Sequence, residues 1–215
     1  VFLLVDVSAS ADFGTAGRTK SAVIGEIAAL LAATATASQD AVGLLLWSDR
    51  VEQWLPPRRG PAQAWKVIRS VLAARPTGRG SDLERALERF EALARRRCLV
   101  FLISDFQTHG YESRLRRIAE RHEVVALRVL DPAERRPPAL GLVACEDAET
   151  GEVAWIDTRD RGFALRAAAL AEGQDRQLSQ GLRASGVDLL TLTTDVPHFP
   201  ALARFFAERA GRFRR

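Results

Sequence analysis

Short, continuously apolar runs rich in branched residues alternate along this chain with segments of helical period. The runs lack the polar alternation of a strand with one wet face, so each strand is expected to be covered on both sides. This alternation predicts an α/β fold, a doubly wound and mostly parallel sheet with helices on both faces. The five expected inner strands are residues 1–5, 42–47, 98–103, 124–129 and 187–192.

Two segments depart from this alternation. Residues 51–55 alternate apolar and polar side chains and follow the preceding strand after three residues, a link too short for a parallel crossover. They are expected to form an antiparallel edge strand that ends at Pro56-Pro57. Residues 140–158 are expected to form a small inserted β-hairpin with Gly151 in its turn, introduced by the proline-rich link 135–138. Covering helices are expected within residues 23–31, 65–72, 83–93, 115–119, 165–183 and 199–212.

Composition and length favour one globular domain over residues 1–215, since 47% of the residues are apolar and 27% charged. The chain has no methionine and opens directly on a strand, which predicts that it is the C-terminal piece of a longer protein. Its longest uninterrupted apolar stretch, residues 27–33, is far shorter than the ~20 residues of a membrane span. Two cysteines, Cys98 and Cys145, do not make a disulfide framework, which favours a cytoplasmic location.

The formal charge of +4 comes from the C-terminal tail. From residue 204 onward five arginines oppose one acid, Glu208, so residues 1–203 are neutral. A neutral body argues against a groove that tracks nucleic acid. The tail arginines, expected to end a solvated helix, are Arg204, Arg209, Arg212, Arg214 and Arg215.

Oxygen-bearing side chains gather where the expected strands end. Asp6, Ser8 and Ser10 follow the first strand at alternate positions, which on extended backbone points all three the same way. Asp105 follows the strand 98–103, and Ser81 lies in a loop before a helix. Ligands of open parallel sheets bind at this edge. Three hydroxyls and two carboxylates suit Mg²⁺ or Mn²⁺, and an open metal position would accept an Asp or Glu side chain of another protein.

The pattern Asp6-Val7-Ser8-Ala9-Ser10 resembles the DxSxS motif of the von Willebrand factor A-type (vWA) domain. Ser81 falls where that family has a threonine, and Asp105 at its last metal ligand. The resemblance is closer to the bacterial A-type proteins catalogued as domain of unknown function fifty-eight, and it covers nearly the whole chain. Its segments are residues 6–14, 42–52, 56–58, 81–83, 102–106 and 149–152.

This resemblance implies a Rossmann-like vWA fold with a metal-ion-dependent adhesion site (MIDAS) that holds Mg²⁺ or Mn²⁺ through Asp6, Ser8, Ser10, Ser81 and Asp105. It implies a non-enzymatic role in binding protein partners. It also implies a parent protein tethered to the inner face of the cell membrane, often found with a MoxR-type AAA+ ATPase. The residues expected to form the partner-binding rim are Asp12, Phe106 and His109. Phe106 stands where many vWA domains have glycine, and its ring is expected to narrow access to the metal.

Other interpretations of the same residues stay open. Ser81 and Glu84 have the spacing of a helix capping box, and Asp105 could accept backbone N–H groups at a strand end. A metal-dependent hydrolase could use Asp6 or Ser8 as nucleophile and His109 as base. The fold could also be a scaffold with an empty site. The sequence contains no GxSxG elbow, P-loop lysine or GxGxxG after the first strand, which disfavours a hydrolase of that type and nucleotide binding.

Overall fold

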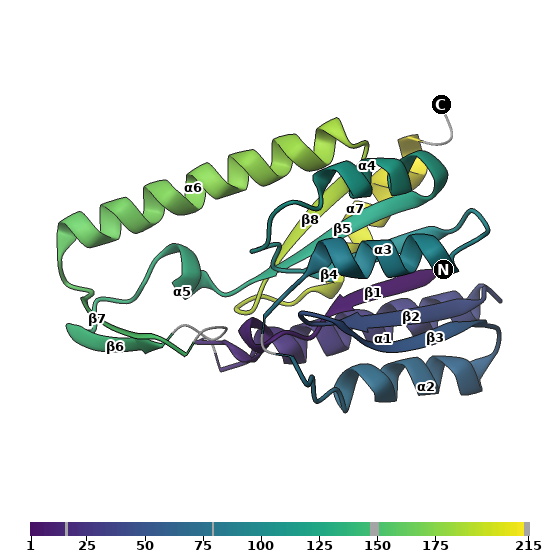
Figure 1. The fold of residues 1–215 in the computed structure, drawn as a ribbon, viewed down its shortest axis with the longest axis horizontal. Coiled ribbons are helices and arrows are strands. Elements are labelled where there is room, and N and C mark those ends of the chain that lie inside the picture. The colour runs from purple at the N-terminus through teal and green to yellow at the C-terminus, as the bar shows by residue number, and fades with distance from the viewer. Residues whose placement is uncertain (16, 79, 147–150, 213–215) are drawn as a thin grey trace.

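Six strands build the main sheet of the computed structural model, which describes residues 1–15, 17–78, 80–146 and 151–212. The strand order is β3-β2-β1-β4-β5-β8, and all neighbours pair in parallel except β2 and β3. The expected doubly wound α/β fold is therefore confirmed (Figure 1). The strands are β1 (Phe2–Asp6), β2 (Val42–Trp47), β3 (Val51–Arg58), β4 (Leu99–Ser104), β5 (Glu123–Leu130) and β8 (Asp188–Thr193).

Helices cover both faces of this sheet, because alternate residues of each inner strand point into different apolar clusters. Leu3 and Val5 of β1 join the cluster under one helical layer, whereas Phe2 and Leu4 join the other. The first layer contains α1 (Lys20–Ala37), α2 (Pro61–Leu72) and α7 (Phe199–Arg212). The second contains α3 (Leu83–Leu93), α4 (Glu112–Arg121) and the C-terminal part of α6 (Arg161–Ala184).

Helix α1 is long and apolar enough to cross a membrane by length and composition alone. Half of it is buried in the molecule, and Val23, Ile27 and Leu31 lie in the core cluster beneath the first helical layer. Its apolar composition is accounted for by this packing.

Three expectations about element boundaries are wrong. Strand β3 continues through Pro56 and Pro57 to Arg58, because an edge strand tolerates proline, which cannot donate a ladder hydrogen bond. Helix α6 begins at Arg161, where Asp160 accepts hydrogen bonds from the N–H groups of Gly162 and Phe163. A short helix that was not expected, α5 (Pro132–Arg135), precedes the proline-rich link and includes its first residue.

The inserted hairpin is confirmed as β6 (Leu142–Glu146) paired with β7 (Val153–Asp157). Residues 148–150 of its expected turn lie outside the described residues, as do Arg214 and Arg215 of the basic tail. The described Gly151 has a positive φ of 76°, as a turn glycine often does.

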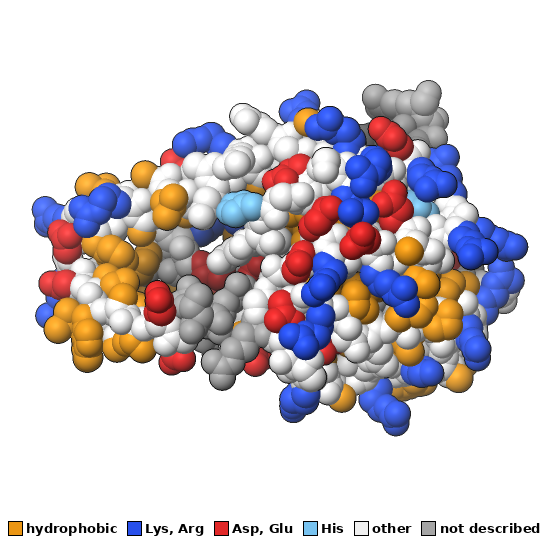
Figure 2. All heavy atoms as spheres, viewed as in Figure 1, with side chains coloured by type: hydrophobic (Ala, Val, Ile, Leu, Met, Phe, Trp, Pro, Cys, Tyr) orange, Lys and Arg blue, Asp and Glu red, His pale blue; other side chains and the backbone are white. Residues whose placement is uncertain are grey.

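The hairpin and the N-terminal half of α6 project beyond the carboxyl ends of the parallel strands (Figure 1). We call the described residues of the range 136–171 the arm. Among the described residues of α6 only Leu182, outside the arm, is buried. Large apolar side chains gather on the arm, at the left of Figure 2. Those that are exposed are Leu140, Leu142, Val153, Trp155, Leu165 and Leu170.

Candidate metal centre

The site is built around the end of β1, which lies between β2 and β4 where the strand order reverses. Asp6 is the last residue of this strand and is 3% exposed. Ser8 then precedes a short 3₁₀ helix, η1 (Ala9–Asp12), which contains Ser10. The expectation that extended backbone through Ser10 would point the three side chains the same way is therefore wrong. The turn of η1 nevertheless leaves the hydroxyls of Ser8 and Ser10 3.2 Å apart.

One hydrogen-bond network joins all five predicted ligands. Asp6 Oδ1 accepts from the N–H of Ser8 (2.9 Å), and Asp6 Oδ2 accepts from the hydroxyl of Ser81 (2.8 Å). The hydroxyl of Ser10 contacts Ser8 Oγ and donates to Asp105 Oδ2 (2.9 Å). Three segments far apart in sequence therefore bring their oxygens together at the carboxyl edge of the sheet.

Ser81 reaches Asp6 because its loop is fixed from both sides. The N–H of Asp82 donates to the carbonyl of Ser48, after β2 (2.8 Å). Asp82, not Ser81, caps α3 by accepting from the N–H of Arg85 (2.9 Å), so the expected capping box is wrong. At Gly78 an added Cβ would lie 2.0 Å from Asp49 Oδ1 and 2.6 Å from Ser48 Oγ, so a larger residue there would have to displace these two side chains.

Lys20, which was not predicted as a site residue, is the first residue of α1 and is 1% exposed. Its ammonium lies 2.8 Å from Asp105 Oδ2 and 2.7 Å from Glu134 Oε1 of α5. Burial lowers the pKa of Lys20, but the two carboxylates outweigh burial and raise that pKa above its usual value. A signal was present: the chain has 31 basic residues, of which two, Lys20 and Lys66, are lysines.

Ser104 was also missed, although it precedes Asp105 in sequence. It is fully buried, and its hydroxyl donates to Asp6 Oδ2 (2.8 Å) and accepts from the N–H of Phe106 (3.0 Å). The serine therefore fixes the metal-site carboxylate and the backbone of the following loop at the same time.

The donor chemistry fits a small divalent cation. Burial, followed by the like charge of Asp105, raises the pKa of Asp6, so a cation nearby would favour its ionised form. Within the described part of the chain no group of three or more His, Cys, Asp or Glu side chains is placed to hold a metal ion. Two carboxylates and three hydroxyls remain, a set of hard oxygen donors that suits Mg²⁺ or Mn²⁺ better than zinc.

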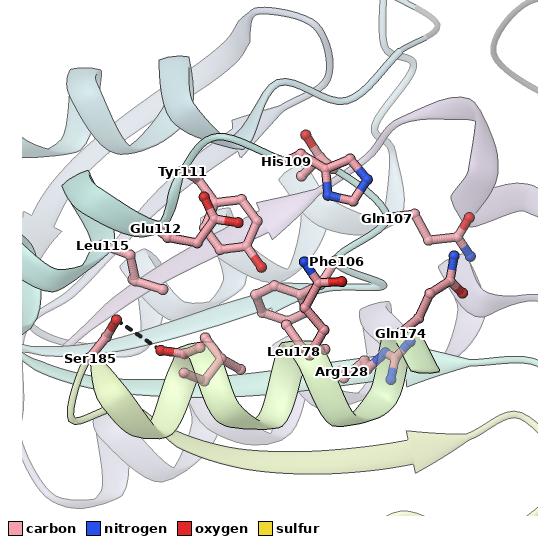
Figure 3. Close-up of a pocket in the computed structure, with 14 residues that line it drawn as sticks. Phe106, Gln107, His109, Tyr111, Glu112, Leu115, Arg128, Gln174, Leu178 and Ser185 are labelled. Atoms are coloured by element: carbon pink, nitrogen blue, oxygen red, sulfur yellow. Dashed lines mark hydrogen bonds between the residues drawn. The ribbon is translucent and has the colours of Figure 1, made fainter. Parts of the chain in front are cut away.

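The three expected rim residues differ in their surroundings. Asp12 is exposed at the end of η1, and His109 is exposed in the loop after β4. In the described residues no hydrogen bond joins His109 to Ser8 or Ser10. Phe106 is 6% exposed, and its ring lines a cavity with Tyr111 (Figure 3). Its φ of +58° is unusual for a residue with a side chain.

A family model described as protein of unknown function DUF58 matches residues 1–177. The chain belongs to this family. One DUF58 relative is the uncharacterized protein Rv1480 of Mycobacterium tuberculosis, which is 33% identical over 213 residues. The match covers 97% of this chain and 66% of that protein, so the chain spans slightly less than two thirds of the relative's length.

Two solved structures share the fold of this DUF58 chain. BatB from Bacteroides thetaiotaomicron superposes with a TM-score of 0.62 at 14% identity and covers 98% of both chains. An aerotolerance-related membrane protein from Bacteroides fragilis gives a TM-score of 0.61 at 12% identity, covering 90% of this chain and 91% of that one. At such identities the similarity establishes the fold alone.

Proposed function

We propose that this domain is a metal-ion-dependent protein-binding module that docks an acidic side chain of a partner. The hydroxyls of Ser8, Ser10 and Ser81 would hold Mg²⁺ or Mn²⁺, with Asp6 and Asp105 binding directly or through water. The observation that carries the proposal is the network that links these residues from three segments at the reversal point of the sheet.

The charges at the rim support the same conclusion. Asp6, Asp105 and Glu134 are formally negative and Lys20 is positive, which leaves a formal charge of −2. A bound dication would balance this charge and supply the positive centre that attracts a carboxylate from outside. Because Lys20 already pairs with Asp105, less negative charge remains to compete with a partner's acid.

Isothermal titration with Mg²⁺ and with Mn²⁺ tests the first half of the proposal. Wild type should bind one ion, whereas Asp6→Asn and Ser8→Ala should each weaken binding by at least about tenfold, or ~1.4 kcal/mol. Asp40→Asn is the matched control, because Asp40 is exposed and precedes β2, at the end of the parallel strands away from the candidate metal centre. Absence of any heat of binding in wild type would contradict the proposal.

Peptide capture tests the second half. Immobilised peptides containing a central Asp or Glu should retain the domain in Mg²⁺ and release it in EDTA, while the Asn and Gln versions should not retain it. Equal retention of acidic and amide peptides would contradict docking through a carboxylate.

The family resemblance extends the proposal to the setting of the whole protein. We infer a parent tethered to the inner face of the cell membrane, with a MoxR-type AAA+ ATPase as the partner that carries the acid. The description of the Bacteroides fragilis neighbour as a membrane protein agrees with this setting. Co-purification of the full-length protein with that ATPase, dependent on Mg²⁺ and lost in Asp6→Asn, is the expected result.

The proposal assigns no catalysis to the site. The competing hydrolase needs His109 as a base for Ser8 or Asp6. Phosphoesters and carboxyl esters should be turned over no faster by wild type than by His109→Ala. A loss of turnover in that variant would favour the hydrolase instead.

A further inference from the structure

A cavity of about 160 Å³ opens beside the candidate metal centre, between the loop after β4 and helix α6 (Figure 3). Its apolar walls come from Phe106 and Tyr111 on the loop side and from Leu178 and Leu182 on α6. The rings of Phe106 and Tyr111 have centroids 6.3 Å apart and are tilted by 53°. A dry apolar cavity of about 150 Å³ is large enough for a benzene ring, so this one has room for a single aromatic side chain.

The metal centre and the cavity share one short segment, residues 104–107. Ser104 Oγ bonds Asp6 and also holds the N–H of Phe106 (3.0 Å), and Asp105 Oδ1 accepts from the N–H of Gln107 (3.2 Å). The backbone on both sides of Phe106 is therefore held by side chains of the candidate metal centre and its neighbour, through the N–H of Phe106 itself and the N–H of Gln107. Phe106 keeps a left-handed backbone there, which is unfavourable for a residue with a side chain.

The wall of the cavity formed by α6 is connected to the candidate metal centre through Arg128. Arg128, 7% exposed, donates from Nε to the main-chain oxygen of Asp105 (3.2 Å) and forms an ion pair with Asp175 of α6. A ligand that reaches Asp105 from solvent therefore finds the cavity immediately beside it, with α6 as the opposite wall.

Polar groups of the cavity are free to meet a ligand. Within the described part of the chain the side chains of His109, Gln174 and Gln177 make no hydrogen bond, and neither does the hydroxyl of Tyr111. Burial, together with the charge of Glu112, raises the pKa of Tyr111 to about 12, which keeps its hydroxyl protonated at neutral pH. Polar side chains line the cavity about as extensively as apolar ones, so an aromatic ring packed on Phe106 and Leu178 would also meet hydrogen-bonding groups.

We propose that this cavity is a specificity subsite that takes an aromatic side chain, Phe or Tyr, of the same partner whose acid docks at the metal centre. The inference rests on the proposed function and narrows the partner to a segment in which an Asp or Glu stands within a few residues of an aromatic residue. Ring contacts with Phe106 and Tyr111 and burial against Leu178 would distinguish such a segment from other acidic ones.

Two glycines of α6 provide a matched pair of variants. An added Cβ meets nothing within 4 Å at either Gly181, which lines the cavity, or Gly173, which does not. Both lie inside a helix, where replacing glycine favours the helical backbone. Gly181→Leu should therefore fill the cavity without loss of folding, and Gly173→Leu controls for the change of helix residue.

The first measurement uses p-cresol as a probe of the cavity and involves no metal and no partner. In methyl NMR spectra of the whole domain, p-cresol should shift the Leu178 and Leu182 signals in wild type and in Gly173→Leu, but not in Gly181→Leu. Absence of these shifts in wild type would overturn the cavity as an aromatic site.

The second measurement uses synthetic peptides that place Phe, Tyr or Ala one to four residues from a single Asp, in Mg²⁺. At the best spacing the aromatic peptides should bind about tenfold tighter than the Ala peptide. Gly181→Leu should reduce this advantage to less than about twofold and leave the Mg²⁺ titration unchanged, whereas Gly173→Leu should keep the advantage.

The outcomes separate the two proposals. Mg²⁺-dependent binding of Asp peptides without any aromatic advantage overturns the subsite and leaves the metal-dependent function standing. Failure of every Asp peptide to bind in Mg²⁺ overturns the proposed function and the subsite with it, even where p-cresol enters the cavity. An aromatic advantage that survives in Gly181→Leu also overturns the subsite.

Discussion

Two charged side chains at the rim of the sheet, Asp6 and Lys20, are buried, which is unfavourable for a charged group unless partners compensate. Asp6 is buried beside a second carboxylate, Asp105, and its hydrogen bonds do not prevent its pKa from rising. Lys20 is buried as well, but two carboxylates surround its ammonium. An added cation would therefore most stabilise the ionised form of Asp6. Lys20 neutralises part of the charge of Asp105 and Glu134, and so reduces the negative charge around a bound cation.

Asp6→Asn should stabilise the metal-free domain at neutral pH. The raised pKa of Asp6 means that its stabilising contribution is present below its ordinary value of 3.8 and is lost as pH rises through the folded-state value. Asparagine carries no charge, and its amide can donate to the Ser81 and Ser104 hydroxyls that now donate to Asp6. Thermal unfolding in EDTA should give a higher Tm, by roughly 2–4 °C for each kcal/mol recovered. A lower Tm in EDTA would contradict this account.

Lys20→Met should destabilise the metal-free domain by about 3–5 kcal/mol, because it leaves Asp105 and Glu134 without their buried partner. Added Mg²⁺ should restore part of this stability, and the variant should bind the ion at least several-fold tighter than wild type, since a nearby positive charge is gone. Urea unfolding with and without Mg²⁺ measures both effects. Lys66→Met, which alters an exposed lysine of α2, is the control. Equal stability of the two variants would refute the role given to Lys20.

At the scale of elements, the loops of the rim are held by a third buried acid, Asp131, between β5 and α5. It is 0% exposed. Asp131 Oδ2 accepts from the N–H of Thr15 (2.8 Å) and from Thr194 Oγ1 after β8 (2.7 Å), while Oδ1 accepts from the N–H of Ala133 (2.9 Å). One carboxylate thus fixes the start of α5, the segment before α1 and the end of β8.

Asp131→Asn should cost about 1–3 kcal/mol at neutral pH, because an amide NH₂ cannot accept the hydrogen bonds that one carboxylate oxygen receives. Burial raises the pKa of Asp131, but the bonds from Thr15 and Thr194 outweigh burial and lower it below 3.8. The stabilisation is therefore present above pH 3.8 and is lost as pH falls through the folded-state pKa. Urea unfolding should show the gap between wild type and variant constant above about pH 5 and smaller in strong acid. A gap that widens in acid would contradict the assignment.

The sequence predicted the strands and helices well, but it did not predict the side-chain contacts between them. Continuous apolar runs marked the inner strands to within a residue or two, because both faces of those strands are buried. The convergence of Asp6, Ser8 and Asp105, the proposed ligands, followed from their place at strand ends. Lys20 and Glu134 did not, because their pairing depends on how α1 and α5 approach β4, which no local pattern encodes. The edge position of β3 was expected, but its end was misplaced because the two prolines were assumed to stop the strand, which an edge strand tolerates.

At the scale of the whole molecule, a well-packed body carries a poorly covered arm. The first half of α6 reads FALRAAALA over residues 163–171, apolar around the whole helix with one charge, although it contributes no buried residue within the described part of the chain. Helices of this composition are normally covered. An isolated two-stranded hairpin such as β6–β7 is also marginal by itself.

Replacing three exposed apolar residues of the arm in one variant (Leu142→Ser, Trp155→Ser, Leu165→Gln) should reduce self-association without lowering Tm. These side chains are 67%, 69% and 72% exposed, so their removal takes little from the core. Light scattering at rising concentration and thermal unfolding measure the two properties. Trp65→Ser, 71% exposed on α2, is the control for loss of a surface tryptophan. A Tm several degrees lower would show that the arm packs more tightly than described.

The two consecutive prolines of strand β3 affect whether copies of this domain can join by strand pairing at high concentration. Successive amides of a strand point to opposite sides, so one of the two missing N–H groups belongs to the side that no neighbouring strand covers. A foreign strand aligned there would find a gap in the row of donors. The missing donor at the proline pair therefore disfavours fibre growth by strand addition along this edge of the sheet.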